Sequence, residues 1–600
     1  MQNLTFNDLG MLHESGILSH LDYYFSLSMA NIFNNAKPLE ILSAALTCRA
    51  LSQGCICLDL ADTAGTFLKN LEGKEFIRLP ELPSWKAILE NSAMVGLEIT
   101  NCKNKKNNKS SWIGEYPLIL DRDNNLYLAR YYDFQSRLSE NIKTRIQRQV
   151  PGPDDMFVTS WLTSFLGNLR EDHSTFGQQQ AVKKALCSGF TMISGGPGTG
   201  KTYITDMIQT VLATWARENN FTPPRVMCLA PTGKAASRLR NGMTIHSALK
   251  PLKNTTGFRH HAANPLAADL VIIDEASMID IALMTRLFEA IRGDARIVML
   301  GDMNQLSPVQ AGAVFSDLCH ADRLSDFRIF LDYNFRSQGK TGIAKLAKAV
   351  NDSDADAVTD ILNTDYPDLE FVDTAVNDEY QTRLGACILE GYRQLWDATS
   401  PSRALDMVDG FRVLCAHNSG GSGTLQINHL CEKILRSKGK DGINLPVFKT
   451  LLMVRRNDYR RLLSNGDTCV VLEEKGVPTA WFSPGQTGSE QSGPRHFRLS
   501  DLPECEPGFA VTVHKSQGSE FDTVLILIPE QISPVVTRQL LYTGITRSRK
   551  KVIIFGSIPL IRQAVQTSIE RRSNLKAVLD RAKVLNSSED GYVDGHEAAL

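Results

Sequence analysis

Residues 195–202 combine glycines, a lysine and a hydroxyl in the spacing of a phosphate-binding loop. The segment reads Gly195-Gly196-Pro197-Gly198-Thr199-Gly200-Lys201-Thr202. Glycines allow successive backbone N–H groups to face phosphate oxygens, and the N-terminus of a following helix adds positive potential. A predicted strand at residues 191–194 precedes the loop, in the order that this chemistry requires. We therefore expect these eight residues to bind a nucleotide, with Lys201 beside the β- and γ-phosphates and Thr202 as a ligand of Mg²⁺.

Two adjacent carboxylates, Asp274 and Glu275, follow a second apolar run at residues 270–273. An isolated Asp-Glu pair is most often a solvated turn, but a pair at the end of a buried strand downstream of a phosphate loop is a specific signal. Asp274 is placed to hold Mg²⁺, and Glu275 is placed to polarise the attacking water as a general base. The two segments together predict hydrolysis of ATP, with ATP and Mg²⁺ as the cofactors.

Further short motifs surround these two segments in a fixed order. They occupy residues 176–178, 230–236, 244–247, 301–306, 333–337, 511–521 and 542–547. Their sequences include Ala-Pro-Thr-Gly-Lys-Ala-Ala from residue 230, Asp-Glu-Ala-Ser from residue 274 and Val-His-Lys-Ser-Gln-Gly from residue 513. These sequences resemble the motifs of superfamily 1 helicases and, among them, those of the RecD family. The resemblance spans residues 175–550, and residues 44–58 add a fainter likeness to the N-terminal region of that family.

The resemblance implies a role for individual side chains. Gln178 would read the adenine edge, Gln305 would sense the γ-phosphate, and Glu520 would contact the nucleotide. Two arginines would reach across a cleft between domains and neutralise charge on the transferred phosphoryl group, which couples hydrolysis to a domain movement. The expected catalytic set is Lys201, Glu275, Gln305, Arg336 and Arg547. The expected DNA contacts are Thr232, Lys234, Thr244, His246, Thr512 and His514, although each also has a structural interpretation, such as a core histidine for His246.

The function that the resemblance implies is 5′-to-3′ translocation and unwinding on single-stranded DNA. Expected partners are single-stranded DNA, DNA ends, and RecB-like and RecC-like subunits in a heterotrimer that acts in double-strand break repair and homologous recombination. Three alternatives stay open: a stand-alone RecD-like helicase, an RNA helicase, and an ATP-gated regulatory subunit that binds DNA without unwinding it. Retention of Gln305 and both arginines favours the motor. The chain also lacks the extended N-terminus of the stand-alone enzymes, which favours the subunit.

The pattern of apolar runs predicts an α/β fold with two RecA-like parallel-sheet motor domains. Short β-branched runs that alternate with helical stretches predict strands at 191–194, 226–230, 270–273 and 297–300, and a second set at 412–416, 510–513, 524–528 and 552–555. We assign the motor domains to 160–325 and to 326–449 with 503–575, an SH3-like β insertion to 450–502, and a disordered tail to 586–600. Residues 1–150 are expected to be a mixed α/β N-terminal domain that docks on a partner. This domain should contain a helix at 39–51, an exposed loop at 101–111 and a hairpin at 116–128.

Net charge, cysteine usage and the lack of long apolar runs indicate how the protein could bind DNA and in which compartment we expect it. Lys and Arg total 65 against 66 Asp and Glu, so any DNA contact must come from local basic grooves. Arg455, Arg456, Arg460 and Arg461 in the insertion could form such a groove or a solvated basic edge. The 12 cysteines include no CxxC pair, which is typical of free thiols in a reducing compartment. No signal-peptide pattern or run of about 20 apolar residues occurs, so we expect a bacterial cytoplasmic protein without a membrane partner.

One stretch imitates a metal-dependent nuclease site, which would need two acids and a lysine around Mg²⁺. Asp467, Glu473 and Lys475 have these residue types, but the two acids should lie at opposite ends of one strand, some 20 Å apart at about 3.3 Å per residue. They could not share a metal ion at that separation. We therefore expect no nuclease site in this chain.

Overall fold

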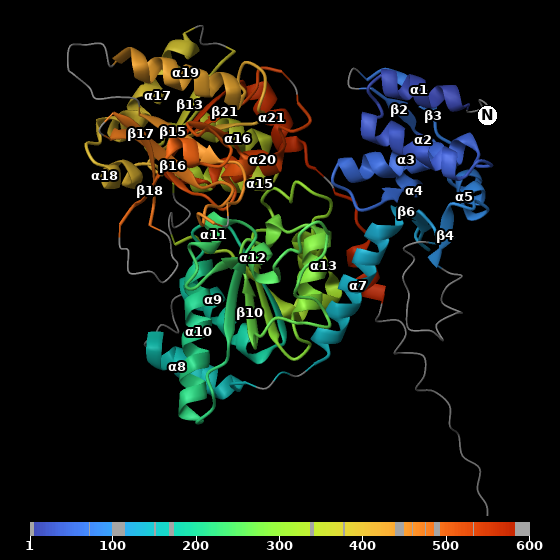
Figure 1. Cartoon of the computed structure of the whole chain (residues 1–600), viewed down its shortest axis with the longest axis horizontal. Coiled ribbons are helices and arrows are strands. Elements are labelled where there is room, and N and C mark those ends of the chain that lie inside the picture. Colours follow the sequence, from blue (N-terminus) through green and yellow to red (C-terminus); the bar gives the residue numbers. More distant parts are fainter. Residues whose placement is uncertain are drawn as a thin grey trace, which may run out of the picture.

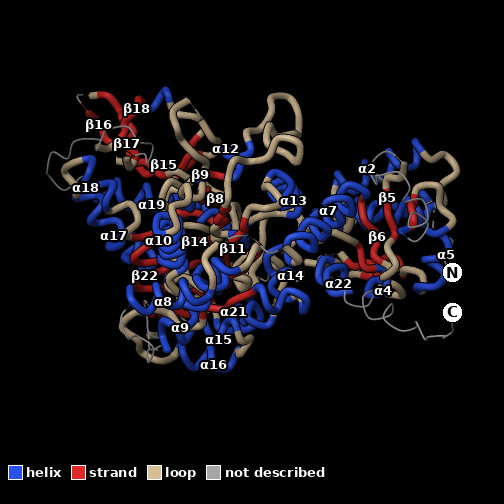
Figure 2. The backbone as a smooth tube through the Cα atoms, turned by 90° about the horizontal axis from the view of Figure 1, so that it is seen from below, coloured by secondary structure: helices blue, strands red, loops and turns tan. Residues whose placement is uncertain are grey.

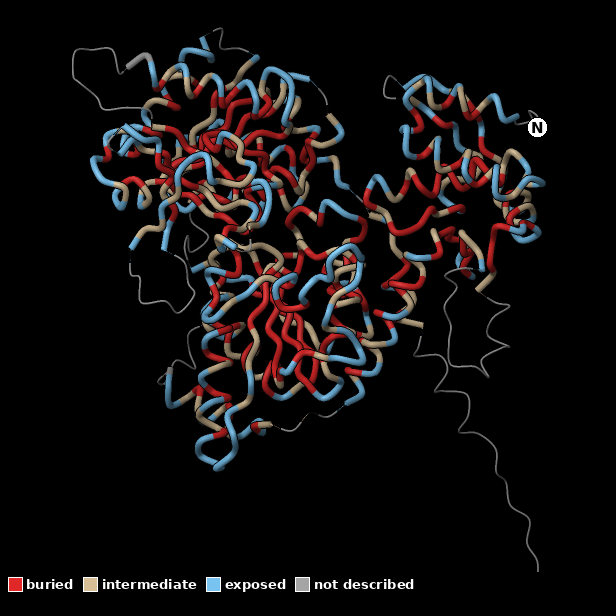
Figure 3. Tube along the Cα trace, in the orientation of Figure 1, coloured by how far each residue is buried: buried red, intermediate tan, exposed pale blue. Residues whose placement is uncertain are grey.

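The computed structural model describes residues 5–70, 73–98, 115–148, 150, 152–166, 173–335, 341–375, 379–438, 449–458, 460–474, 476–484, 493–531, 533–569 and 571–581. Figure 1 shows an N-terminal domain in blue, a sheet domain mainly in green (sheet domain 1) and another in yellow to red (sheet domain 2). Each has its own buried core, seen as red tube in Figure 3. The tail and the exposed loop predicted at 586–600 and 101–111 lie outside the described residues.

Sheet domain 1 is built on a parallel sheet with the order β12-β7-β11-β10-β8-β9. Its strands are β7 (Phe190–Gly195), β8 (Val226–Ala230), β9 (Met243–Thr244), β10 (Leu270–Ile273), β11 (Arg296–Gly301) and β12 (Arg328–Leu331). Neighbouring strand residues such as Val271 and Ile272 enter separate hydrophobic cores on the two faces. A sheet that is buried on both faces requires the continuous apolar runs seen in the sequence.

Helices cover both faces of this sheet. One face carries α8 (Asp155–Leu166), α9 (His173–Cys187) and α10 (Lys201–Glu218), and the other carries α12 (Ile245–Leu249), α13 (Ile281–Ala290) and α14 (Val314–His320). The sequence predicted β7, β8, β10 and β11, but not β9 or β12. β12 begins beyond the expected boundary at residue 325, yet Arg328 pairs with Met192 of β7 and so extends the first sheet.

Sheet domain 2 repeats the architecture with the parallel order β13-β22-β21-β14-β20. Its strands are β13 (Leu369–Asp373), β14 (Phe411–Cys415), β20 (Ala510–Thr512), β21 (Phe521–Leu527) and β22 (Ser548–Gly556). One face carries α15 (Gly342–Asn351), α16 (Ala355–Leu362), α20 (Arg538–Ile545) and α21 (Ile558–Gln566), and the other carries α17 (Tyr380–Asp397), α18 (Pro401–Asp406) and α19 (Thr424–Lys438). Of these strands, only β13 was not predicted.

An antiparallel sheet is inserted between α19 and β20 of sheet domain 2. Its order is β18-β17-β16-β15-β19, with β15 (Thr450–Val454), β16 (Thr468–Glu474), β17 (Val477–Phe482), β18 (Arg495–Arg498) and β19 (Cys505–Pro507). A separate small core fills it, centred on Val454, Val471 and Phe482. The sheet reaches past the expected end at residue 502, because β19 pairs with β15.

The N-terminal domain packs helices against a four-stranded mixed sheet with the order β1-β6-β5-β4. Its helices are α1 (Phe6–Glu14), α2 (His20–Ile32), α3 (Pro38–Ser52), α4 (Leu60–Thr63) and α5 (Leu82–Glu90). Its strands are β1 (Leu58–Asp59), β2 (Phe67–Lys69), β3 (Glu75–Arg78), β4 (Val95–Leu97), β5 (Leu118–Leu120) and β6 (Asn125–Leu128). The predicted helix at 39–51 and the hairpin at 116–128 are confirmed by α3 and by the antiparallel pair β5–β6.

Two helices join the N-terminal domain to sheet domain 1, as Figure 2 shows. α7 (Ala129–Ile146) packs along α13, and Arg145 donates hydrogen bonds to carbonyls at the end of α13, among them that of Ile291 at 2.7 Å. α22 (Leu575–Asp580) returns from sheet domain 2 and adds Leu575 and Leu579 to the same core. The sequence assigned α7 to the N-terminal domain and most of α22 to no domain, but the apolar faces of both helices pack on sheet domain 1.

Among the described helices, none is both long and apolar enough to cross a bilayer. Eleven cysteines are described, and all of them are free thiols.

Candidate nucleotide site and DNA track

The predicted phosphate loop lies between the buried strand β7 and the start of α10. Gly200 has a φ of 86°, and a side chain there would place Cβ 2.0 Å from Nε2 of Gln178, so only glycine fits. Lys201 Nζ donates hydrogen bonds to the carbonyls of Gly195 (2.5 Å) and Gly196 (3.0 Å). The ammonium group therefore lies along its own loop, where it can exchange neutral carbonyl partners for phosphate oxygens.

Gln178 lies on α9 and is buried against the loop. Its Nε2 donates to the Thr199 carbonyl at 3.0 Å, so the side-chain amide braces the loop. The resemblance predicted that Gln178 would read an adenine edge. This hydrogen bond uses Nε2 of the amide group, and the adenine contact stays a prediction.

Asp274 and Glu275 lie at the carboxyl end of β10, beside the phosphate loop. Asp274 is buried, and burial together with the Glu275 carboxylate raises its pKa to about 6, although Lys201 opposes the shift. Glu275 has a φ of 52° and a ψ of 40°, a left-handed conformation that costs a non-glycine residue roughly 1–2 kcal/mol. Backbone strain of this kind is concentrated at functional sites, and here it turns the Glu275 side chain into the cleft.

The site also offers oxygen ligands that suit Mg²⁺. The Asp274 carboxylate and Thr202 line the same cleft, and oxygen donors of this kind are those that Mg²⁺ prefers. Ser277 Oγ and Gln305 Oε1 are buried without a hydrogen-bond partner in the described chain. Buried polar atoms usually have partners, so the Ser277 hydroxyl is free to bond water or a phosphate oxygen, and Gln305 Oε1 is free to accept a hydrogen bond from water.

Gln305 follows β11 and connects the cleft to sheet domain 2. Its Nε2 donates to Asp302 Oδ2 at 3.0 Å, and the same oxygen accepts the Tyr542 hydroxyl at 3.1 Å. The next residue, Leu306, is buried in the core of sheet domain 2 although it belongs to sheet domain 1. The carboxylate of Asp302 therefore joins a candidate phosphate sensor to the opposite domain through two hydrogen bonds.

Arg547 is buried at the face of sheet domain 2 that meets the cleft. Its Nε donates to the Thr543 carbonyl and its Nη1 to the Ser519 carbonyl, each at 3.2 Å. Its Nη2 is buried without a partner in the described chain. A charged donor in this state favours the approach of an anion, because an unpartnered buried charge is costly.

These groups line one cleft of about 380 Å³ between the two sheet domains. Its lining consists of Pro197, Gly198, Gly200, Lys201, Thr202, Ala235, Arg238, Asp274, Glu275, Gln305, Glu520, Arg547 and Arg549. Gly195, Gly196, Thr199 and Gln178 are not part of this lining. Arg336 lies outside the described residues, but the N–H of Phe335 donates to the Gly198 carbonyl at 3.0 Å, so the preceding chain reaches the loop.

Two cations of the cleft, Arg238 and Arg549, were not predicted from the sequence. Arg549 follows Arg547 by two residues and donates to Glu520 at 3.3 Å. Arg238 follows α11 (Gly233–Ala236) by two residues. Neither arginine belongs to a recognisable motif, and only their closeness to Arg547 and Lys234 in sequence could have indicated them.

The six predicted DNA contacts have different neighbours within the described chain. Thr232 and Thr244 use their hydroxyls to accept the N–H of Ala235 and Ser247, which caps two short helices. Lys234 forms an ion pair with Asp409 of sheet domain 2 at 3.1 Å. Burial lowers the pKa of Lys234, although Asp409 opposes the shift. This lysine therefore joins the two sheet domains in the present conformation.

The other three candidates are separate from this contact. His246 is exposed on α12 with its ring 5.8 Å from that of Phe258, so it is not a core histidine. Thr512 lines a small cavity of about 180 Å³ between α19, β19 and β20. His514 follows β20, and burial and the charge of Arg571 lower its pKa.

Arginines of the antiparallel insertion are largely neutralised by carboxylates. Arg456 pairs with Glu504 at 3.2 Å, Arg461 with Asp458 at 2.7 Å, and Arg455 with both Glu504 and Glu506. Asp467 and Glu473 lie at opposite ends of β16, and Lys475 lies outside the described residues. The strand therefore holds the two acids apart, in the arrangement expected from the sequence.

Two parallel sheets that share one phosphate cleft, with the loop on one and an arginine on the other, define a two-domain nucleotide-driven motor. Family models match three segments: an AAA domain at residues 173–366, a UvrD-like helicase C-terminal domain at 507–555, and the RecBCD enzyme subunit RecD, N-terminal domain, at 14–127. The RecBCD enzyme subunit RecD of Mycobacterium tuberculosis is 30% identical over 597 residues, covering 94% of this chain and 95% of that protein. The chain belongs to the RecD family.

Other relatives have lower sequence identity to this chain. RecD of Haemophilus influenzae is 26% identical over 664 residues, with 95% of this chain and 99% of that protein covered. The ATP-dependent RecD2 DNA helicase of Deinococcus radiodurans is 27% identical over 469 residues, with 76% and 58% covered. A solved Bacteroides Pif1 helicase with ADP-AlF3 and single-stranded DNA is 18% identical, with a TM-score of 0.38 and coverage of 71% and 97%.

Proposed function

We propose that the chain is the 5′-to-3′ DNA motor subunit of a RecBCD-like helicase–nuclease that acts in double-strand break repair and homologous recombination. The observation that carries this proposal is the shared cleft, in which Lys201 and Glu275 of sheet domain 1 face Arg547 of sheet domain 2. Such an arrangement makes hydrolysis depend on the relative position of the two domains. Membership of the RecD family supports DNA as the track.

In the proposed reaction, Lys201 and the loop N–H groups hold the β- and γ-phosphates of ATP. Glu275 takes a proton from water while the water oxygen bonds to the γ-phosphorus, and the bond from that phosphorus to the bridging oxygen of ADP breaks. Arg547 stabilises the negative charge that spreads over the transferred group. Asp274 and Thr202 would hold Mg²⁺, which neutralises phosphate charge when it is bound.

Release of phosphate would then change the contacts that join the two sheet domains. Gln305 Oε1, which has no partner in the described chain, can accept a hydrogen bond from the water that attacks the γ-phosphate, while its Nε2 donates to Asp302, which also accepts the Tyr542 hydroxyl. Lys234 and Asp409 form a second contact that domain opening would break. In the open state Lys234 becomes available for a DNA phosphate, which is the role that its motif implies.

The N-terminal domain is proposed to dock on RecB-like or RecC-like subunits. Leu21, Tyr24 and Ile32 of α2 are 65%, 60% and 66% exposed and recur at helical spacing on one side of the helix. An apolar stripe of this size on a surface helix is typical of a protein interface. We also propose that the antiparallel sheet is an SH3-like module of the second motor domain.

Unwinding of tailed duplexes tests the proposed function directly. The full chain, with ATP and Mg²⁺, should unwind DNA with a 5′ single-stranded tail and not DNA with a 3′ tail or the equivalent RNA. Single-stranded DNA should also raise the rate of ATP hydrolysis, and the affinity behind this effect should fall steeply with salt because backbone contacts release counterions. An ATPase that ignores DNA at low salt would indicate the regulatory alternative instead.

A further inference from the structure

One loop of sheet domain 1, residues 302–313, contacts the nucleotide cleft, sheet domain 2 and the N-terminal domain. Near its start, Gln305 lines the nucleotide cleft. Leu306 donates its N–H to Thr543 Oγ1 (3.0 Å) and accepts Nε2 of Gln517 (2.8 Å), so it touches two motifs of sheet domain 2. The far end reaches the N-terminal domain, where the Gly312 N–H donates to the Gly54 carbonyl at 2.9 Å.

The far end of the loop is tightly defined. Gly312 has a φ of 102°, a conformation that favours glycine, and a Cβ there would meet the side chain of Ile56 at 3.2 Å. Gly312 follows Gln305 by seven positions in the chain. Even a fully extended chain would therefore place their Cα atoms no more than roughly 25 Å apart. Because the segment is short, we expect a movement of Gln305 to displace Gly312 and the reverse.

Arg571 fixes this far end in place. Its Nη1 donates to the Gln310 carbonyl at 2.7 Å and the Gly312 carbonyl at 3.4 Å. A Cβ on Gly54 would lie 2.8 Å from the Arg571 Cζ atom, so the guanidinium also packs on the N-terminal domain. No carboxylate of the described chain forms an ion pair with Arg571, and its Nε is buried without a partner there.

The charge of Arg571 also reaches the DNA motif of sheet domain 2. The loop that Arg571 holds contacts this motif directly, since Gln517, three residues after His514, donates to the Leu306 carbonyl at 2.8 Å, and the charge of Arg571 contributes to the lowered pKa of His514. Burial lowers the pKa of Arg571 itself. One guanidinium therefore contacts both the loop that carries Gln305 and the N-terminal domain, and the same loop contacts the motif that contains His514.

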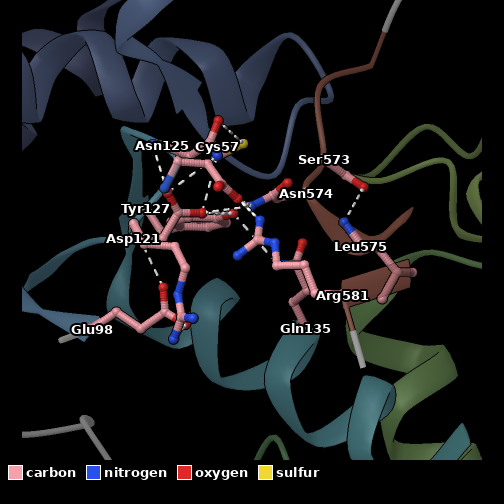
Figure 4. Close-up of polar contacts among 12 residues, drawn as sticks. Cys57, Glu98, Asp121, Asn125, Tyr127, Gln135, Ser573, Asn574, Leu575 and Arg581 are labelled. Atoms are coloured by element: carbon pink, nitrogen blue, oxygen red, sulfur yellow. Dashed lines mark hydrogen bonds and ion pairs between the residues drawn. The ribbon is translucent and has the colours of Figure 1, made fainter. Parts of the chain in front are cut away.

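The residues that follow Arg571 anchor it to the N-terminal domain and sheet domain 1. Arg572 pairs with Asp62, Ser573 Oγ donates to Asp317 at 2.7 Å, and Asn574 Nδ2 donates to Asp121 at 2.8 Å. Figure 4 shows Asn574 directed at the buried Asp121 carboxylate, which also accepts the Tyr127 hydroxyl. The anchor is rigid because Asp121 is buried and its oxygens are satisfied by several donors.

We propose that Arg571 is a positioning residue of the ATPase cycle, which holds the 302–313 loop against the N-terminal domain so that DNA near His514 and phosphate at Gln305 influence each other. This inference rests on the proposed function. It assigns Arg571 no contact with ATP, and its effect on hydrolysis is exerted through the loop. Asn574 anchors this segment to the N-terminal domain, and Ser573 anchors it to sheet domain 1.

The test compares Arg571→Ala, Arg571→Lys and the neighbouring Arg572→Ala in the full chain. Steady-state ATP hydrolysis is measured against ATP concentration without DNA and with saturating oligo(dT), and thermal melting monitors folding. Arg571→Ala should reduce the DNA-stimulated kcat about fivefold or more, the size of an ordinary coupling between sites. Arg571→Lys keeps the charge and one donor, so it should restore part of the stimulation. Arg572→Ala should lower the melting temperature and keep the stimulation.

Several results would overturn the proposal. Stimulation within twofold of wild type in Arg571→Ala, or an equal loss in Arg572→Ala, would mean that the segment is only a structural clamp. If Arg571→Ala does not fold, Arg571→Lys decides. Full stimulation of its ATPase at the same half-saturating DNA concentration as wild type would also mean that the segment is only a structural clamp. A wild-type chain that shows no DNA stimulation would instead contradict the proposed function.

Discussion

Replacement of Arg547 by lysine tests the cleft most sharply. The guanidinium is fixed by the carbonyls of Thr543 and Ser519, and its Nη2 is left without a partner in the described chain. A lysine ammonium cannot bridge both carbonyls and also reach a phosphate, so the charge is kept but its placement is lost. Arginines in this role contribute about 10³–10⁵ in rate, which corresponds to roughly 4–7 kcal/mol of barrier. We expect Arg547→Lys to lower kcat about 10³-fold, with KM for ATP changed by no more than about threefold.

The assay is steady-state hydrolysis of ATP at saturating single-stranded DNA, together with binding of a fluorescent ATP analogue. Arg549→Lys is the matched control, because Arg549 lines the same cleft but its side chain is 39% exposed and paired with Glu520. A partly exposed ion pair contributes little, so this variant should stay within about tenfold of wild type. Equal losses in the two variants, or a kcat of Arg547→Lys within tenfold of wild type, would refute the assigned role.

Three further predictions address the loop, the base and the C-terminal anchor. Lys201→Ala should abolish hydrolysis and leave circular dichroism unchanged, since the lysine contacts only loop carbonyls; global unfolding would count against this role. Glu275→Gln should bind ATP normally but turn it over very slowly, and lost affinity with normal turnover of bound ATP would contradict it. Burial raises the pKa of Asp317 to about 7 from 3.8. Between these two pH values the folded state holds a proton that the unfolded state has lost. The free energy of unfolding therefore falls as pH rises from about 4 to 7, by at most roughly 4 kcal/mol. Asp317→Asn, which imitates the protonated acid, should therefore raise the melting temperature by a few degrees at pH 8 and by clearly less at pH 5, where about a third of the effect is present, whereas equal shifts at both pH values would exclude this explanation.

Much of the fold could be predicted because buried parallel strands have an unmistakable pattern. Residues 270–273 are all apolar, and the structure buries them on both faces of the first sheet. β9 and β12 were missed because one has two residues and the other is an edge strand with Phe330 exposed. The amphipathic pattern of α7 shows that one face is buried, but it does not say against which domain.

The candidate site was predictable where chemistry fixes the local sequence. The phosphate loop and the Asp-Glu pair have required spacings, and the structure brings Lys201 and Glu275 into one cleft. Lys234 and Gln178 were expected to contact DNA and adenine, but tertiary neighbours occupy both in this conformation. Arg571 has no local signal at all, since its importance arises from carbonyls about 260 residues earlier in the chain.

The return of α22 to sheet domain 1 has a consequence for biosynthesis. Leu575 and Leu579 complete a core whose other members are all encoded before residue 325. Translation of the roughly 250 intervening residues takes about 12–50 s at 5–20 residues per second. During that interval a nascent sheet domain 1 exposes the apolar groove that α22 later fills, and it remains a target for chaperones until the last part of the chain leaves the ribosome.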